Sequence, residues 1–206
     1  MFYYIEGAVT EIGQNLAVID VGGVGYGCKV TANTLSRLEP DKKARLFTYC
    51  YIREDAFDIY GFMDLGEKRC FEHLLSVSGV GPKAALSILS TVTPESLALA
   101  VINNDATALT MAQGVGKKLA LRIILELQDK VDKQAGESIH IPSSVETGSE
   151  ALADINAPGV KLQNATAALA VLGYSQSEIS SAIRHIDTDA LTVVEIIRAV
   201  LKGSAK

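Results

Sequence analysis

The centre of the chain repeats itself. Residues 74–89 match residues 109–124 position by position when the sequence is laid on itself with an offset of 35, the distance between Gly79 and Gly114. Each copy has apolar residues before a tight turn, and a small alanine and two more apolar residues at helical spacing after it. The turns are Gly79, Val80 and Gly81, and Gly114, Val115 and Gly116. This pattern predicts an all-helical domain, over residues 64–133, that contains two hairpins of paired helices.

The two turns have the chemistry of a phosphate-binding site. Glycine adopts positive φ without a Cβ clash, and the N–H groups at the start of the following helix have no partner within that helix. Unpaired donors and the positive end of the helix dipole attract an anion. The basic side chains near the turns are Lys83, Lys117, Lys118 and Arg122. We therefore predict that both turns bind nucleic-acid phosphates.

Other interpretations of these glycines fit less well. Glycine turns between packed helices, with solvated lysines nearby, explain one copy of the repeat but poorly explain two. A truncated ATP-binding loop at Gly116 and Lys117 lacks its first glycine, because Met111 stands there, and Lys118 replaces the required serine or threonine. The glycines of residues 22–27 lack dinucleotide-binding spacing, and no helical pattern follows them. The sequence predicts no ATPase motif of its own.

The first 63 residues predict a small β-barrel. Runs with period-2 alternation, rich in β-branched and aromatic residues, are separated by turn residues. These runs are residues 2–6, 8–12, 16–21, 24–31, 46–53 and 57–62. Residues 34–38 fit one helical turn. About five strands in so short a segment favour a five-stranded oligonucleotide-binding (OB-fold) barrel.

The remaining residues predict a linker and a small helical bundle. Residues 134–157 hold four acidic and no basic residues among proline, glycine and serine, which predicts a flexible linker. Residues 158–206 predict a three-helix (UBA-like) bundle, with capping boxes beginning at Ser175 and Thr192. The predicted helices are 161–172, 176–186 and 192–202. A bundle of this size suits a docking module better than a buried active site.

Composition excludes several classes of protein. With 48% hydrophobic and 21% charged residues, the chain folds. The longest uncharged stretch, 162–177, is shorter than the ~18 residues that span a bilayer, and residues 1–9 carry no basic leader, so we expect a cytoplasmic protein. The three cysteines and three histidines are too scattered to predict a metal site. The net charge of −5 does not argue against DNA binding, because residues 64–133 are neutral overall.

The paired hairpins resemble the helix-hairpin-helix motif, which binds the DNA backbone without reading bases. All 206 residues together resemble the RuvA family, the DNA-binding subunits of the bacterial Holliday-junction branch-migration complex. Besides both hairpins, the resemblance rests on residues 21–26, Arg53 to Asp55, Tyr60 to Phe62 and Leu172 to Tyr174.

The resemblance implies a scaffold in DNA recombination and repair rather than an enzyme. Four subunits would surround a four-way junction, and whether two such tetramers enclose the DNA stays open. The C-terminal bundle would recruit RuvB, a hexameric ATPase motor, through the stretch that contains Leu172 and Tyr174. RuvC, a resolving nuclease, would join the same junction. No cofactor or metal of its own is implied, because the motor uses the ATP.

Glu54 and Asp55 lie between the last two predicted strands, and so at a hairpin tip. From the residues alone, such acidic side chains are most simply solvated. The resemblance instead implies an acidic pin that points at the crossover and repels phosphates there. Together with attraction at the hairpins, this repulsion would select junction shape over sequence.

Two further functions would share the hairpins. A DNA glycosylase would need a catalytic aspartate or lysine in a base-flipping pocket, but residues 125–135 lead into the predicted linker instead. A non-catalytic subunit of another repair complex has no reason to combine the acidic tip and the C-terminal bundle in this order.

Overall fold

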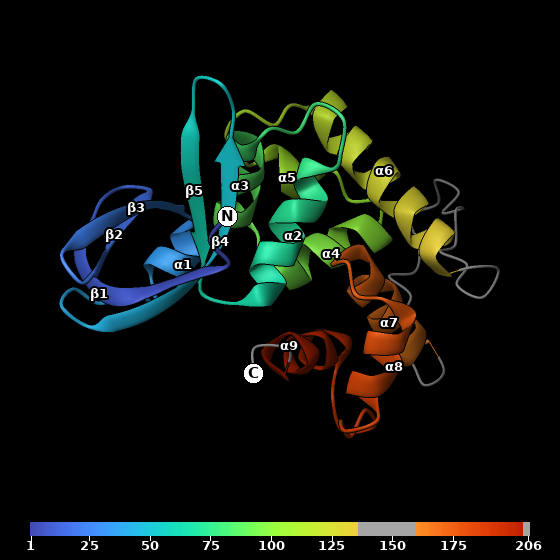
Figure 1. The fold of residues 1–206 in the computed structure, drawn as a ribbon. Coiled ribbons are helices and arrows are strands. Elements are labelled where there is room, and N and C mark those ends of the chain that lie inside the picture. The colour runs from blue at the N-terminus through green and yellow to red at the C-terminus, as the bar shows by residue number, and fades with distance from the viewer. Residues whose placement is uncertain (136–159, 204–206) are drawn as a thin grey trace.

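The structure is a computed structural model that describes residues 1–135 and 160–203 (Figure 1). A barrel lies beside a helical domain, and three C-terminal helices pack on the helical domain (Figure 1). The predicted linker lies outside the described residues, except for residues 134 and 135, which end a helix.

The predicted five-stranded barrel is confirmed. Its strands close in the order β1-β2-β3-β5-β4, and the β3–β5 pair is parallel while the other pairs are antiparallel. The elements are β1 (Tyr4–Ile12), β2 (Leu16–Val21), β3 (Val24–Val30), α1 (Ala32–Leu35), β4 (Lys43–Ile52) and β5 (Phe57–Phe62). Alternate apolar side chains fill the barrel, as the period-2 pattern predicts.

One prediction about the strands is wrong. The separate runs 2–6 and 8–12 form the single strand β1, which continues through Gly7. A Cβ at this glycine would overlap the carbonyl oxygen of Asp20, so the residue marks a close approach of β2 rather than a turn. The irregularity of β1 comes later, as a register shift between Val9 and Glu11.

The helical domain contains both predicted hairpins, but their first helices differ in length. The elements are α2 (Leu65–Leu75), α3 (Pro82–Thr91), α4 (Pro94–Ile102), α5 (Thr107–Thr110) and α6 (Lys117–Ala135). The first hairpin pairs α2 with α3, whereas the second pairs the four-residue α5 with the 19-residue α6. Among the described residues, no single helix is long and apolar enough to cross a membrane, and α3 with α4 reaches that length only as a pair bent by 95°.

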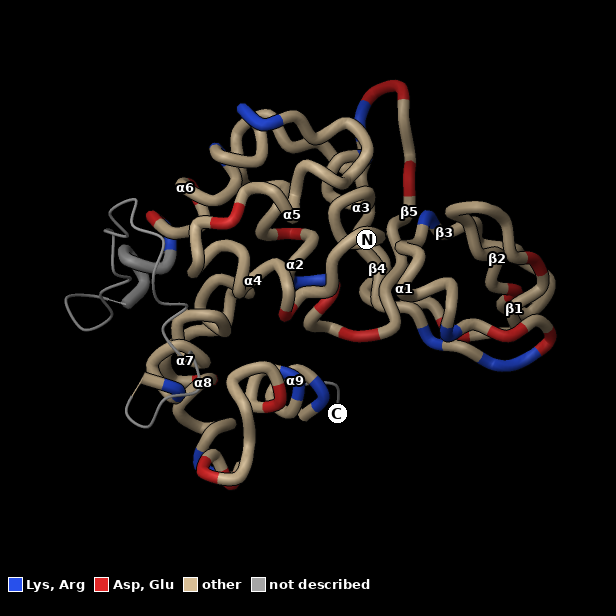
Figure 2. Tube along the Cα trace, turned by 180° about the vertical axis from the view of Figure 1, so that it is seen from behind, with Lys and Arg blue, Asp and Glu red and all other residues tan. Residues whose placement is uncertain are grey.

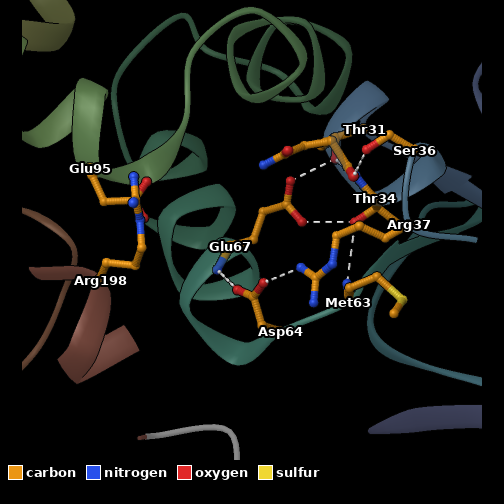
Figure 3. A network of polar contacts seen from close by, with 10 residues as sticks. Thr31, Thr34, Ser36, Arg37, Met63, Asp64, Glu67, Glu95 and Arg198 are labelled. Atoms are coloured by element: carbon orange, nitrogen blue, oxygen red, sulfur yellow. Dashed lines mark hydrogen bonds and ion pairs between the residues drawn. The ribbon is translucent and has the colours of Figure 1, made fainter. Parts of the chain in front are cut away.

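A buried carboxylate joins the barrel to the helical domain (Figure 3). Glu67 of α2 accepts hydrogen bonds from the hydroxyls of Thr31 at 2.6 Å and Thr34 at 2.8 Å, and its side chain is buried. Beside it, Asp64 caps α2 and pairs with Arg37 at 2.9 Å. Because Thr31 and Thr34 belong to the barrel, this network fixes the orientation of the barrel on α2.

The C-terminal bundle has the three predicted helices, α7 (Lys161–Val171), α8 (Gln176–Ile183) and α9 (Val193–Gly203). Both predicted capping boxes are present, since Ser175 and Thr192 each exchange hydrogen bonds with a glutamate three residues later. The bundle is continuous with the core of the helical domain, because α7 packs on α4 and α6 and α9 packs on α2 and α4.

Candidate nucleic-acid interface

The two hairpin turns have the same backbone geometry. Three backbone hydrogen bonds recur at the offset of 35 residues. Before the turn, the N–H of Val77 donates to the carbonyl of Leu74 (3.1 Å), as that of Ala112 does to Leu109 (3.2 Å). Within the turn, the N–H of Val80 donates to the carbonyl of Val77, as that of Val115 does to Ala112 (both 3.1 Å). After the turn, the N–H of Ala85 donates to the carbonyl of Gly81 (3.0 Å), as that of Ala120 does to Gly116 (2.9 Å). The sequence repeat is therefore a structural repeat, with matching core positions before and after each turn.

The two glycines of each turn have different roles. Gly79 and Gly114 adopt φ of 87° and 83°, where a side chain would be strained. Gly81 has φ of −94°, so the expectation of positive φ is wrong for this second glycine. A Cβ at Gly81 or Gly116 would meet no atom within 4 Å. The second glycine thus keeps the approach to the helix N-terminus open.

The start of α3 has the free donors that the prediction requires. Gly81 is the N-cap residue and makes no side-chain capping bond, so the N–H groups of the first turn have no cap within the described structure. Pro82 occupies the first helical position, where its missing N–H costs nothing. An anion placed here would meet several donors at once.

Val80 and Val115 cannot contact DNA through their side chains. They are 7% and 5% exposed and belong to the core of the helical domain. Each valine anchors its turn between two exposed glycines. Any contact of these two predicted DNA-binding residues with DNA would therefore use the backbone.

The basic side chains near the turns are exposed, as their predicted role requires. Lys83 lies in the first turn of α3, and Lys117 and Lys118 begin α6. Arg122 of the second hairpin reaches across to the first, where its Nη1 donates to the carbonyl of Ser78 at 3.4 Å. The two turns are therefore joined by a basic side chain, and binding of DNA by all four residues stays a prediction.

Sequence reasoning missed how α6 supports the first turn. The N–H of Ser78 donates to Oε2 of Glu126 at 3.0 Å, and Nζ of Lys130 donates to the carbonyl of Ser76 at 3.1 Å. With Arg122, these side chains form a row at spacings of four residues along one face of α6. That spacing was visible in the sequence, but the partner turn was not.

Glu54 and Asp55 lie at the predicted hairpin tip. The N–H of Arg53 donates to the carbonyl of Ala56 at 2.8 Å and closes the loop between β4 and β5, leaving both acids exposed. The acidic tip and the basic start of α6 lie at the same edge of the molecule (Figure 2). Groups that repel a polyanion and groups that attract it are thus presented at one edge of the molecule.

Leu172 and Tyr174 are buried, although the predicted contact with a motor requires exposed side chains. They are 0% and 2% exposed, and the guanidinium of Arg69 covers the ring of Tyr174 at 4.6 Å. In this arrangement neither side chain can contact another protein. The contact from Arg69 of α2 shows that the packing of the bundle on the helical domain covers part of Tyr174.

The cysteines and histidines form no metal site in the described ranges. No group of three or more histidine, cysteine, aspartate or glutamate side chains there could hold a metal ion. Cys28 and Cys70 are buried, and burial raises the pKa of the Cys28 thiol to about 12. These two residues are packed thiols, as their spacing predicts.

Duplicated turns with open backbone donors, exposed basic flanks and an acidic tip at one edge define a protein of the tandem helix-hairpin-helix class, built to meet a nucleic-acid backbone. The comparisons agree. Residues 1–61 match the family description "RuvA N terminal domain", residues 71–129 match "SAM-like Helix-hairpin-helix tandem", and residues 161–205 match "RuvA, C-terminal domain".

The chain belongs to the RuvA family. It is similar to proteins named "Holliday junction branch migration complex subunit RuvA" in three bacteria. The relative in Acetivibrio thermocellus is 40% identical over 207 residues, and that in Caldanaerobacter subterraneus is 41% identical over 207 residues, each covering 100% of both chains. The relative in Ruminiclostridium cellulolyticum is 38% identical over 204 residues, covering 98% of this chain and 100% of the relative.

Proposed function

We propose that this protein is the non-catalytic, junction-binding subunit of a branch migration complex. The observation that carries the proposal is the pair of equivalent turns with open donors, set at the same edge as the acidic tip. Each turn would hold one phosphate of a DNA arm. Family membership over the whole chain supports four-way junction DNA as the ligand and a motor as the partner.

Junction selectivity would come from opposing charges. At the arms, backbone donors and lysines attract phosphates. At the centre, each carboxylate of Glu54 and Asp55 that lies 4 Å from a phosphate in water repels it by ~1 kcal/mol, and by more where solvent is excluded. Continuous duplex across the tip would bring phosphates against these carboxylates, whereas a junction opens at its centre. Shape, not base sequence, would then decide affinity.

We propose that the working assembly is a homotetramer, single or doubled around the DNA, that operates with RuvB and RuvC in the cytoplasm. Exposed apolar side chains support an assembly of several copies. Leu121 and Leu125 of α6 are 53% and 58% exposed on one helix face, and Tyr3 and Tyr4 project from the barrel. Surfaces of this kind are typical of subunit contacts. The ATP would be hydrolysed by the motor, so this subunit needs no cofactor.

The proposal is tested by competition between a synthetic four-way junction and linear duplex of the same sequences, with no nucleotide and no partner present. Preferential shift of the junction without cleavage is the expected result. Equal affinity for both DNAs would reduce the function to general backbone binding. Cleaved or base-released product would instead indicate an enzyme.

Neutralising the acidic tip is expected to weaken the preference for junctions. In Glu54→Gln with Asp55→Asn, loss of two repelling charges per subunit should raise duplex affinity several-fold, about 1 kcal/mol, relative to junction affinity. The competition assay measures this ratio. Glu11→Gln with Asp41→Asn, two exposed acids elsewhere on the barrel, is the charge-matched control. An unchanged ratio in the tip variant would contradict the pin.

Junction affinity is expected to fall steeply with salt. Four basic side chains near the turns would release roughly 3 to 4 counterions per engaged subunit, at about 0.9 per phosphate. Titrations from low to moderate salt give the slope of log Kd against log salt concentration. Lys117→Ala with Lys118→Ala should lower that slope by about two per engaged subunit. A flat response of the natural chain would contradict phosphate binding by the turns.

A further inference from the structure

The C-terminal bundle is docked on the helical domain through α7, whose C-terminal half is buried on all sides. Residues 167–172 of α7 and its C-cap are buried without interruption. A helix of a three-helix bundle normally buries one face and exposes the other. Here α8 and α9 cover one side of α7, and α4 and α6 cover the other. The second face of α7 is apolar because it packs on α4 and α6 of the helical domain, which form its docking surface.

Polar contacts lie around this docking surface. Arg69 of α2 pairs with Glu178 of α8, with Nη2 and Oε1 3.0 Å apart, while its guanidinium lies over Tyr174. Arg198 of α9 approaches Glu95 of α4 to 3.6 Å (Figure 3). In each pair, one charged side chain belongs to the helical domain and the other belongs to the bundle. Both pairs include partly exposed members, so each ion pair contributes little to the docking by itself.

The fit is closest at the end of α7. Gly173 has φ of 86° and lies against His73 of α2, whose imidazole ring occupies the place that a side chain at position 173 would take. Leu201 of α9 lies similarly against Gly66 of α2, with its Cδ2 2.8 Å from the position of a Cβ there. At two points of the interface, a side chain from one partner thus packs directly against a glycine backbone of the other. This complementarity is typical of a specific contact rather than a chance one.

We propose that the docked bundle is a closed state that hides the motor-binding surface. This inference rests on the proposed function, in which the bundle recruits the motor. When the bundle undocks, the outer face of α7 and the ring of Tyr174, which Arg69 of α2 now covers, become an exposed apolar patch, which is the kind of surface that binds a protein partner. Docking and motor binding would use the same residues and exclude each other. The motor then binds with an affinity reduced by the fraction of open molecules.

Charge reversal at the two ion pairs around the docking surface, which we call the rim contacts, tests the proposal. Arg69→Glu places a carboxylate against Glu178, and Arg198→Glu places one against Glu95, at separate points of the interface. Arg184→Glu makes the same charge change at an exposed position of the bundle. All are full-length chains, measured without DNA. Hydrogen exchange of α4 and α7 reports docking, and titration with purified RuvB hexamer reports motor affinity.

Both rim variants are expected to exchange roughly three- to tenfold faster in α4 and α7 and to bind the motor tighter by a similar factor, whereas Arg184→Glu matches the natural chain. Two independent rim variants keep the test decisive if one folds poorly. Unchanged exchange in both would overturn the docked state. Faster exchange with unchanged motor affinity would overturn the sequestration alone. If no chain, including the natural one, binds the motor, the proposed recruitment fails and the sequestration fails with it, while the exchange rates still decide docking.

Discussion

Aspartate in place of both Gly81 and Gly116 is expected to abolish junction binding without unfolding the protein. Both positions precede a helix and have open space where a Cβ would stand. Aspartate is a preferred N-cap residue and differs from glycine there by only a few tenths of a kcal/mol, so the free energy of unfolding should change by less than about 0.5 kcal/mol. Its carboxylate would accept the N–H groups of the first turn. The donors would be occupied by an anion that also repels phosphate.

The size of the loss follows from the bonds removed. A hydrogen bond to a charged group contributes about 1.5–3 kcal/mol, so losing one phosphate at each of two turns corresponds to roughly 3–6 kcal/mol per subunit. Junction affinity should fall at least ~100-fold, measured by fluorescence anisotropy beside thermal unfolding. Asparagine at both positions, which caps without a charge, should give an intermediate loss. A folded aspartate variant that binds the junction normally would remove the turns from the interface.

The first glycines provide the complementary comparison. Gly79 and Gly114 have positive φ, so alanine at these positions is strained and should lower the melting temperature. Alanine at Gly81 and Gly116 meets no neighbour and should not. The same substitution in one turn thus separates the residue that shapes the backbone from the residue that leaves it accessible.

Features set by short stretches of sequence were predictable. The turn at Gly79 and its copy at Gly114 depend on residues within about one helical turn, and so do the capping boxes at Ser175 and Thr192. The acidic tip followed in the same way from two adjacent strands. Duplication added what one turn lacks, because a coincidence of spacing is improbable twice at the same offset.

Features that depend on contacts between distant segments were not predictable. Arg122 lies beside its own turn in sequence but reaches the carbonyl of Ser78, 44 residues away. The contact of Arg69 with Glu178 spans 109 residues, and the same guanidinium lies over the buried ring of Tyr174. Apolar residues of α7 predicted a core but not which of two surfaces they would cover. Periodicity gives the buried face of a helix, and only tertiary packing gives its partner.

Removal of the buried carboxylate of Glu67 is expected to destabilise the protein strongly. In Glu67→Ala, the hydroxyls of Thr31 and Thr34 lose the acceptor to which both donate, and a cavity is left between α1 and α2. Buried donors without partners cost about 1–3 kcal/mol each, so the free energy of unfolding should fall by about 3 kcal/mol and the melting temperature by about 6–12 °C. Glu72→Ala, on the same helix but partly exposed, should change stability by less than about 1 kcal/mol.

The pH dependence of Glu67 distinguishes its charge from its hydrogen bonds. Burial raises the pKa of this carboxyl above its ordinary 4.5, while the bonds from the two threonines act in the opposite direction. Because the folded pKa is the higher one, the folded state binds the proton more tightly, and this contribution to stability is complete below pH 4.5 and is lost as pH rises through the folded pKa.

The stability advantage of the natural chain over Glu67→Gln should therefore shrink between pH 4.5 and neutral pH, as measured by urea unfolding of both chains. The difference between two chains that differ at one side chain cancels the titration of the others. An advantage that grows with pH would mean that the threonine hydroxyls stabilise the charged carboxylate by more than burial disfavours it.

The Glu67 network also bears on DNA binding, because it orients the acidic tip on the barrel relative to the hairpin turns on the helical domain. The junction-to-duplex affinity ratio of folded Glu67→Ala should therefore decrease, whichever pH dependence is observed.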